Sequence, residues 1–144
     1  MISKGYCARL LGRARTKILM GWTQGAEARA KDGRKVLPTS SFAIEWSLFG
    51  AVLAEIKATA TSPTFFDIER EVLRLLLHEV TGAYAGSIGS YGTGRVTPAS
   101  IKKQLEDWND DQARTKIDVL QALARAAEAA STIRRKEPEN DSCK

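Results

Sequence analysis

Four polar residues have side chains that could hold a small ligand together: Gln24, Asn109, Asp110 and Arg114. Two amides, a carboxylate and a guanidinium supply donors and acceptors of both charges, and the indole of Trp22 could cover a group bound among them. They form a pocket only if segments far apart in the sequence meet in space. The alternative is structural, with Asn109 or Asp110 capping a following helix, Arg114 pairing with Asp110, and the tryptophans packing helices together. The residue types fit both interpretations.

No arrangement typical of a catalytic or metal site accompanies these residues. The sequence contains one histidine, His78, and two cysteines, Cys7 and Cys143, which are too few ligands for a zinc site. His78 neighbours Glu79 on a predicted helix, where adjacent side chains point in different directions. No nucleophile elbow, zinc-binding helix motif or phosphate-binding loop is present. We therefore expect no metal and no cofactor, and an enzyme would need a site without a known motif around His78 or Asp110.

Positive charge is concentrated in the first quarter of the chain. The 144 residues have a net charge of +5, but the first 36 hold nine basic and two acidic residues, which gives +7 and leaves −2 for the other 108. Arg9, Arg13 and Lys17 recur four residues apart on a predicted helix, and Arg34 and Lys35 follow an Asp-Gly turn. Such a basic region attracts nucleic acid or an acidic protein surface, unless it only faces water.

The hydrophobic pattern predicts one all-α domain over residues 1–136, followed by a disordered tail at 137–144. The hydrophobic content of 43% is enough for a single core. Five helices are predicted, over residues 3–20, 41–57, 62–81, 97–108 and 112–136. A hairpin around Asp32-Gly33 is a weaker alternative, because its flanks do not alternate apolar and polar residues.

The second and last predicted helices are expected to form the centre of the core. In the second, Phe42, Trp46, Phe49, Leu53 and Ile56 recur at near-helical spacing, and Gly50 indicates close contact with a neighbouring helix. The last helix, capped by residues 109–111, has two adjacent apolar rows. The first row is Ala113, Ile117, Leu120, Ala124 and Ala127, and the second is Val119, Leu123, Ala126, Ala130 and Ile133.

A glycine-rich segment joins the third and fourth predicted helices. Residues 82–94 contain five glycines and the two tyrosines Tyr84 and Tyr91. The composition predicts a mobile connecting loop, or a loop that becomes ordered when its tyrosines contact a partner.

Several short motifs together resemble a small, functionally uncharacterised domain family of bacteria and their phages. They are Gly21-Trp22-Thr23-Gln24-Gly25, Asp32-Gly33, Trp46-Ser47, Gly50-Ala51, Trp108-Asn109-Asp110, Arg114-Thr115 and Val119-Leu120. Ser47 stands where that family often has cysteine, which speaks against a thiol-based role. The resemblance implies a shared domain and no particular chemistry.

We expect a non-enzymatic helical module that binds an acidic protein surface, such as a phage- or prophage-borne inhibitor or regulator of host machinery. The expected contact residues are Arg9, Arg13, Lys17, Arg34, Lys35, Tyr84 and Tyr91. Nucleic-acid binding through the basic first helix is the alternative, although the alanine-rich last helix lacks the Arg, Asn and Gln of a recognition helix. Without a bilayer-spanning apolar stretch or a signal peptide, we expect a cytoplasmic protein with no membrane partner.

Overall fold

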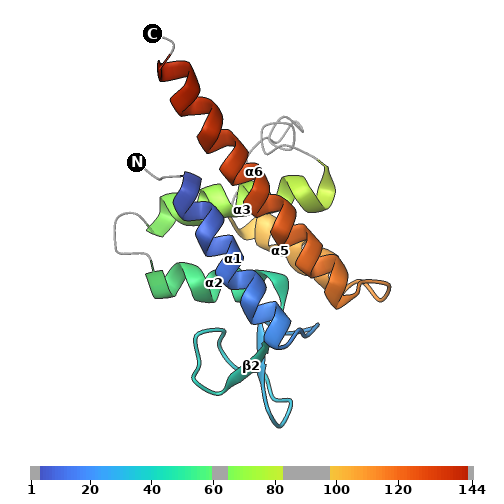
Figure 1. Cartoon of the computed structure of the whole chain (residues 1–144). Helices are drawn as coiled ribbons and strands as arrows, with labels where there is room; N and C mark the ends of the chain where they lie inside the picture. The colour runs from blue at the N-terminus through green and yellow to red at the C-terminus, as the bar shows by residue number, and fades with distance from the viewer. Residues whose placement is uncertain (1–3, 60–64, 83–97, 143–144) are drawn as a thin grey trace.

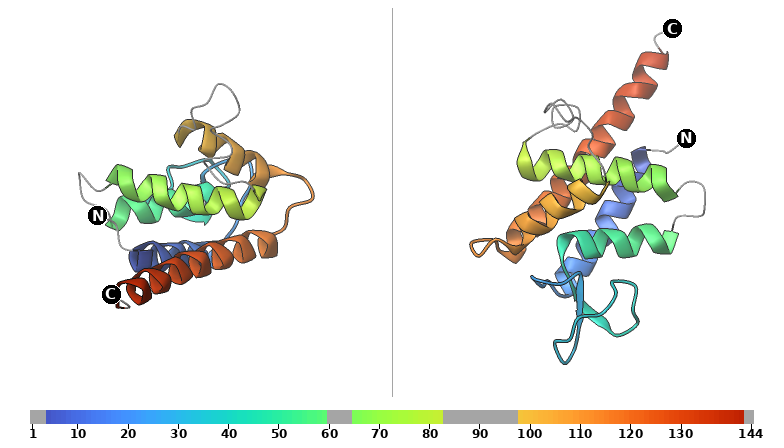
Figure 2. Two further views of the ribbon diagram at one scale, coloured as in Figure 1. Left: turned by 90° about the horizontal axis from the view of Figure 1, so that it is seen from above. Right: turned by 180° about the vertical axis from the view of Figure 1, so that it is seen from behind.

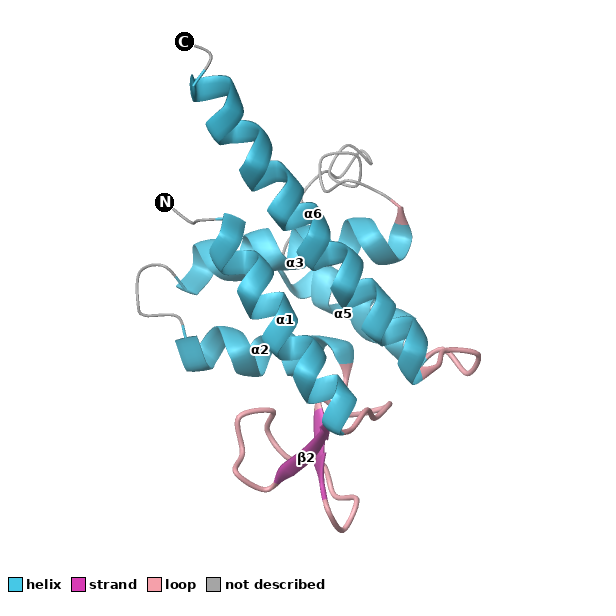
Figure 3. Cartoon of the chain, viewed as in Figure 1, coloured by secondary structure: helices cyan, strands magenta, loops and turns pink. Residues whose placement is uncertain are grey.

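A computed structural model of the chain describes residues 4–59, 65–82 and 98–142, and it is mainly helical with a small two-stranded sheet. The elements in chain order are α1 (Lys4–Met20), β1 (Ala28–Ala30), β2 (Ala43–Trp46), α2 (Leu48–Thr59), α3 (Phe65–Thr81), α5 (Pro98–Asp110) and α6 (Lys116–Ser142). Figures 1 and 3 show the sheet as a separate projection below the helices, next to the end of α1.

The helices form two layers around one core. α1 and α6 lie side by side in one layer, while α2, α3 and α5 make the other (Figure 2). Leucine, isoleucine and valine fill the space between the layers. The largest fully buried side chains are Leu10, Leu11, Ile18, Leu48, Val52, Ile56, Val72, Leu73, Leu76, Leu77, Leu105 and Leu123. No helix of the described residues is both long and apolar enough to cross a membrane.

The predicted ends of α1 and α3 are confirmed, and both depend on glycine. Gly21 donates its N–H to the Lys17 carbonyl at 3.0 Å, and a side chain at Gly21 would collide with the Ile44 carbonyl oxygen. Gly82 has a φ of +76° and donates to the His78 carbonyl at 2.8 Å. Glycine adopts this left-handed conformation without the steric cost that a Cβ brings, so α3 stops here.

The prediction of a purely all-α fold is wrong because residues 43–46 form a strand instead of the first turn of a helix. β2 pairs antiparallel with β1, and Ala28 lies opposite Trp46. On its other side, Trp46 exchanges backbone hydrogen bonds with Gly21 and Thr23 at 2.9 and 3.1 Å. The backbone N–H and C=O groups of the strand are thus hydrogen-bonded to other segments and not within a helix. Phe42, expected in the core, is therefore 64% exposed at the edge of the strand.

α2 begins only at Leu48, after Ser47. The Ser47 hydroxyl oxygen accepts the Gly50 N–H at 3.0 Å, which makes Ser47 the N-cap of the helix. Gly50 makes a close contact, as predicted, but its neighbour is not a helix: a Cβ at this position would overlap the Glu27 carbonyl oxygen. The loop before β1 therefore packs directly on the first turn of α2.

α6 begins at Lys116, four residues later than predicted, and residues 109–111 do not cap it. Asn109 and Asp110 instead end α5. The cap of α6 is a reciprocal capping box formed by Thr115 and Asp118. The Asp118 N–H donates to Thr115 Oγ1 at 3.1 Å, and the Thr115 N–H donates to Asp118 Oδ2 at 3.0 Å. Pro138 does not end α6, which is described as far as Ser142.

The second of the two predicted apolar rows of α6 is the more deeply buried, while Leu120 and Ala127 of the first row pack against the core at partly buried positions. Val119, Leu123, Ala126 and Ala130 are fully buried, whereas Ile117 of the first row is 63% exposed. The small alanines of the buried row allow α1 to approach α6 closely along its length (Figure 2).

Candidate functional site

The Trp22–Gly25 turn meets the end of α5, and the centre of this contact is Asn109. Asn109 is fully buried, and both ends of its amide are fully used. Its Oδ1 accepts the Trp22 Nε1–H at 2.8 Å and the Leu48 N–H at 3.0 Å. Its Nδ2 donates to the Thr23 carbonyl at 3.1 Å and to Asp110 Oδ1 at 3.0 Å. One side chain thereby joins the turn, α2 and α5.

Gln24 and Asp110 complete this contact, which we call the Asn109 cluster (Trp22–Gly25, Leu48 and Asn109–Asp111). Gln24 Nε2 donates to the carbonyls of Asn109 and Asp111, both at 2.9 Å. The Gly25 N–H donates to Asp110 Oδ1 at 3.0 Å. Orphan carbonyls at the C-terminus of α5 therefore gain a partner from a distant turn.

Arg114 lies beside the cluster and packs on Trp108. Its guanidinium stacks on the Trp108 ring, 3.8 Å from the ring centroid, and its Nε donates to the Trp108 carbonyl at 2.8 Å. Arg114 also forms an ion pair with Asp118, with Nη1 3.9 Å from Asp118 Oδ2. The sequence had predicted Asp110 as its partner. Arg114 thus fixes the turn between α5 and α6.

Trp22, Gln24, Asn109, Asp110 and Arg114 were predicted either to form a ligand pocket or to have a structural role. The structure brings Trp22, Gln24, Asn109 and Asp110 together, but their polar atoms bond to one another and to the backbone. A small cleft of about 120 Å³ remains beside them. Its walls are Gly25, Ala26, Ser47, Glu106 and Asp110.

Glu106 is an acidic side chain in the wall of this cleft. Burial raises the pKa of Glu106 above its usual value, an effect that Lys102 opposes and that Glu27 and Asp110 reinforce. Lys102 also pairs with Glu27 at 3.0 Å, and this hydrogen bond raises the pKa of Lys102. The carboxylates of Glu27 and Glu106 thus lie near the ammonium group of Lys102. Among the described residues, no group of three His, Cys, Asp or Glu side chains could hold a metal ion.

The basic row on α1 is partly used within the molecule. Arg13 Nε lies 3.1 Å and Lys17 Nζ 3.4 Å from the two carboxylate oxygens of Glu55 on α2. Lys17 also lies over the Trp46 ring, 4.8 Å from its centroid. Arg9 is exposed and contacts the ring of Tyr6 at 5.9 Å. The row is therefore less free to bind phosphates than its spacing in the sequence indicates.

Arg34 and Lys35 lie in the exposed loop after β1. Arg34 forms an ion pair with Asp32 at 3.4 Å and lies 5.4 Å from the centroid of the Phe42 ring. The remaining two predicted contact residues, Tyr84 and Tyr91, lie outside the described residues, together with nearly all of the glycine-rich segment. His78 is half-buried on α3.

A surface feature that the sequence did not reveal is the position of the exposed apolar side chains. Within the described residues, the large ones are Leu19, Met20, Leu37, Phe42, Ile44 and Ile117. They come from the end of α1, the start of α6, β2 and the loop before it, all at the end of the molecule that carries the sheet (Figure 1). Hydrophobic pattern alone assigned Phe42 and Ile117 to the core, and only the strand and the shifted cap show otherwise.

The elements bearing four of these side chains are in direct contact. Lys116 Nζ donates to the Leu19 carbonyl at 2.9 Å, which ties the start of α6 to the end of α1. Gly21, next to Met20, packs against the backbone of Ile44. We call Leu19, Met20, Ile44 and Ile117 the terminal apolar surface; their exposed fractions are between 46% and 71%.

Comparison with known proteins identifies the family of the domain. No curated protein and no solved structure matches the chain. One family, described as a family of unknown function, matches residues 6–129, a range that runs from the first helix to well inside α6 and includes the Asn109 cluster and the terminal apolar surface. The chain therefore belongs to this family of unknown function, DUF6197.

Proposed function

We propose that this chain is a non-enzymatic protein-binding module and that its partner contacts the terminal apolar surface. The observation that carries the proposal is the concentration of exposed large apolar side chains at one end of the domain. Single exposed apolar residues are ordinary on any protein, but a group of them on contacting elements marks interaction sites.

The charges around this surface favour an acidic partner. Lys116 is adjacent to Ile117 in the sequence, and its Nζ reaches the Leu19 carbonyl. Lys17, which pairs with Glu55, precedes Leu19 and Met20 on α1. The loop after β1 adds Arg34 and Lys35 near the sheet. A partner with an apolar centre and an acidic rim would match this arrangement, since complementary charges at a rim speed association and exclude wrong partners.

The polar clusters support binding better than catalysis. In the Asn109 cluster the amides bond to backbone groups, and Glu55 is held by Arg13 and Lys17. Neither arrangement places a nucleophile beside a general base. The narrower predictions, a phage-borne inhibitor or regulator and a cytoplasmic location, extend this proposal.

The test is capture of a partner from lysate, with and without nuclease treatment, by the tagged chain and two double variants. Met20→Asp with Ile117→Asp places charge on the terminal apolar surface. Gln121→Asp with Ala124→Asp adds the same charge at exposed positions further along α6 and is the matched control. We expect one protein in stoichiometric amount with the wild type and the control, and none with the surface variant.

Three outcomes would contradict the proposal. The first is equal capture by both variants. The second is recovery of nucleic acid that disappears with nuclease treatment, which would favour the nucleic-acid alternative. The third is a dimer of the purified chain that only the surface variant dissociates, because the surface would then join two copies of the chain.

A further inference from the structure

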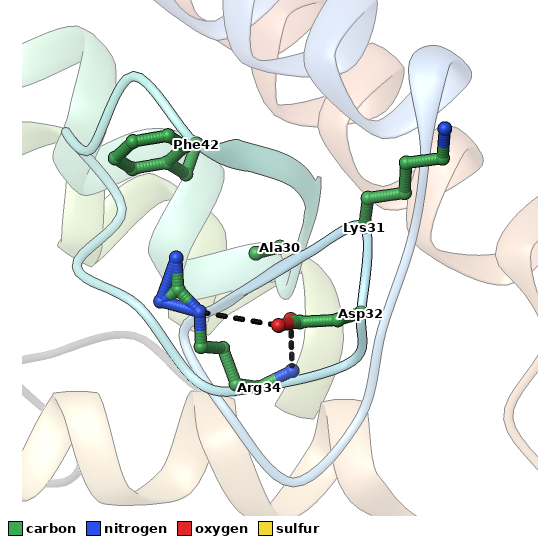
Figure 4. A pocket seen from close by; sticks show the side chains of 5 residues that line it. All are labelled: Ala30, Lys31, Asp32, Arg34 and Phe42. Atoms are coloured by element: carbon green, nitrogen blue, oxygen red, sulfur yellow. Dashed lines mark hydrogen bonds and ion pairs between the residues drawn. The ribbon is translucent and has the colours of Figure 1, made fainter.

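We infer that a groove in the sheet region recognises an acidic peptide segment that carries an apolar side chain. The inference rests on the proposed protein-binding function and names the chemistry of the partner. The groove has a volume of about 510 Å³ and is lined by Ala30, Lys31, Asp32, Arg34 and Phe42 (Figure 4).

The groove lies between two loops whose conformations are fixed by hydrogen bonds. In the first loop, the Ala30 N–H donates to the Arg34 carbonyl at 2.9 Å, and Gly33 at the turn has a φ of +88°. Arg29 Nη1 donates to the Gly33 carbonyl at 2.9 Å and holds the turn against the sheet. A ligand therefore meets a wall that is already in place, which lowers the entropic cost of binding.

The second wall is fixed in the same way. Trp46 Nε1 donates to the Pro38 carbonyl at 3.0 Å from a buried position in β2. The Phe42 N–H donates to Ser40 Oγ at 3.0 Å, which orients the residue at the edge of the groove. Phe42 is 64% exposed and offers a ring face for an apolar side chain.

Arg34 supplies the groove's recognition of negative charge. Figure 4 shows its guanidinium below the Phe42 ring and Asp32 pointing toward it, with Lys31 at the rim and directed away. The pair with Asp32 uses Nε at 3.4 Å, and the terminal nitrogens Nη1 and Nη2 have no hydrogen-bond partner among the described residues. Guanidinium nitrogens bind carboxylates well, and a nearby ring does not block them.

The local charge selects an acidic ligand over a basic one. Lys31, Arg34 and the adjacent Lys35 outnumber Asp32, and the side chains of Asp32 and Arg34 are 67% and 53% exposed. A carboxylate entering the groove would gain Arg34 and compete with Asp32 for it. Asp32 therefore weakens the binding of acidic ligands, and replacing Asp32 should strengthen their binding.

The test is titration of the ¹⁵N-labelled full chain with a blocked five-residue peptide of four glutamates around one leucine, followed by NMR. The control peptide has glutamines in place of the glutamates. We expect saturable shifts in residues 30–35 and 37–43 with the acidic peptide only. Arg34→Gln should weaken binding about tenfold. Asp32→Ser should strengthen it, because serine can still accept the Arg34 N–H that Asp32 Oδ1 accepts at 3.1 Å.

The inference is wrong if the acidic peptide causes no shifts, if both peptides bind alike, if the shifts lie outside these loops, or if Asp32→Ser weakens binding as Arg34→Gln does. It is also wrong if a single-stranded oligothymidylate shifts the same residues more strongly than the peptide. None of these results affects the conclusion of the capture experiment. If Met20→Asp with Ile117→Asp still abolishes capture, the protein-binding function stands and only the groove's role falls.

Discussion

The indole Nε1–H of Trp22 donates to Oδ1 of the fully buried Asn109 at 2.8 Å, across 87 positions of sequence. The same oxygen accepts the Leu48 N–H, so one acceptor serves both the Trp22 turn and the first turn of α2. The contact is therefore a structural junction between parts of the chain that are distant in sequence.

Replacing Asn109 with alanine should be among the most destabilising polar substitutions in the domain. Asn109→Ala leaves Trp22 Nε1–H, the Leu48 N–H and the Thr23 carbonyl without their buried partner. We expect a loss of about 3 kcal/mol in the free energy of unfolding, since each unsatisfied buried group costs about 1–3 kcal/mol. Denaturant unfolding measures it. Trp22→Phe removes only one donor and should cost less; equal losses for both variants would contradict the central role of Asn109.

The two glycines Gly50 and Gly12 should respond in opposite directions to alanine. Gly50→Ala forces a Cβ into the Glu27 carbonyl oxygen, whereas nothing lies within 4 Å of a Cβ at Gly12. We expect Gly50→Ala to destabilise the domain by at least about 2 kcal/mol. Gly12→Ala should stabilise it by about 0.5–1 kcal/mol, because alanine favours the helical backbone. Thermal unfolding of the two variants would show it, and a Gly50→Ala protein as stable as the wild type would disprove the close contact.

Neutralising Glu55 should release the basic row of α1. Glu55→Gln weakens the contacts with Arg13 and Lys17, and we expect a modest loss of about 1 kcal/mol in stability because both cations can reach solvent. Binding to a DNA duplex at low salt should increase, because two more cations become available for phosphates. Glu45→Gln makes the same change in net charge at a half-buried position that forms no ion pair with any other described residue. If both variants bind DNA equally, the ion pairs with Glu55 do not reduce DNA binding by Arg13 and Lys17.

Glu106 should make stability depend on pH in the direction opposite to a salt-bridged carboxylate. Because its pKa is raised in the folded state, folding favours the protonated form. The wild type should lose stability as the pH rises from the usual glutamate value of 4.5 through the raised pKa. Glu106→Gln should therefore be more stable than the wild type at pH 7, by less than about 1 kcal/mol at this solvent-screened site.

Unfolding of both proteins between pH 3 and pH 8 provides the measurement. Below pH 4, where the carboxyl is protonated in both the folded and unfolded states, the two curves should meet. Glu128→Gln, which neutralises an exposed carboxylate on α6 that is not among the charges acting on Glu106, is the control and should show no such gain at pH 7. A stability gain of Glu106→Gln over the wild type that increases as the pH falls would contradict the prediction.

The helices that the sequence predicts well are those with a clear apolar face and a local stop signal. α1 and α3 satisfy both conditions, since Gly21 and Gly82 end them through backbone geometry that depends on the glycine itself. β2 was missed because the spacing of Phe42, Trp46 and Phe49 fits a helix, and a four-residue strand becomes stable only through partners elsewhere in the chain.

The candidate site was predictable in its residues but not in its role. Gln24, Asn109 and Asp110 do meet, yet whether they face a ligand or one another depends on distances that no local pattern encodes. The cap of α6 shows the same limit: both Asn109-Asp110 and Thr115 are good caps, and only the end of α5 decides between them. The exposure of Ile117 follows from that choice.

The Asn109 cluster also determines how the family can vary in length. It closes a loop of 87 positions between Trp22 and Asn109. Within it, the connection that would lengthen joins the packed helices α3 and α5 and comprises residues 82–97. The entropy of closing a flexible loop grows only with the logarithm of its length, so ten added residues there would cost about 0.4 kcal/mol. Insertions and deletions between these two helices are therefore nearly free of energetic cost, whereas a change of even one residue between Trp22 and Gly25 would break the junction. Related chains should thus differ most in length between α3 and α5, and they can acquire new segments there without rebuilding the domain.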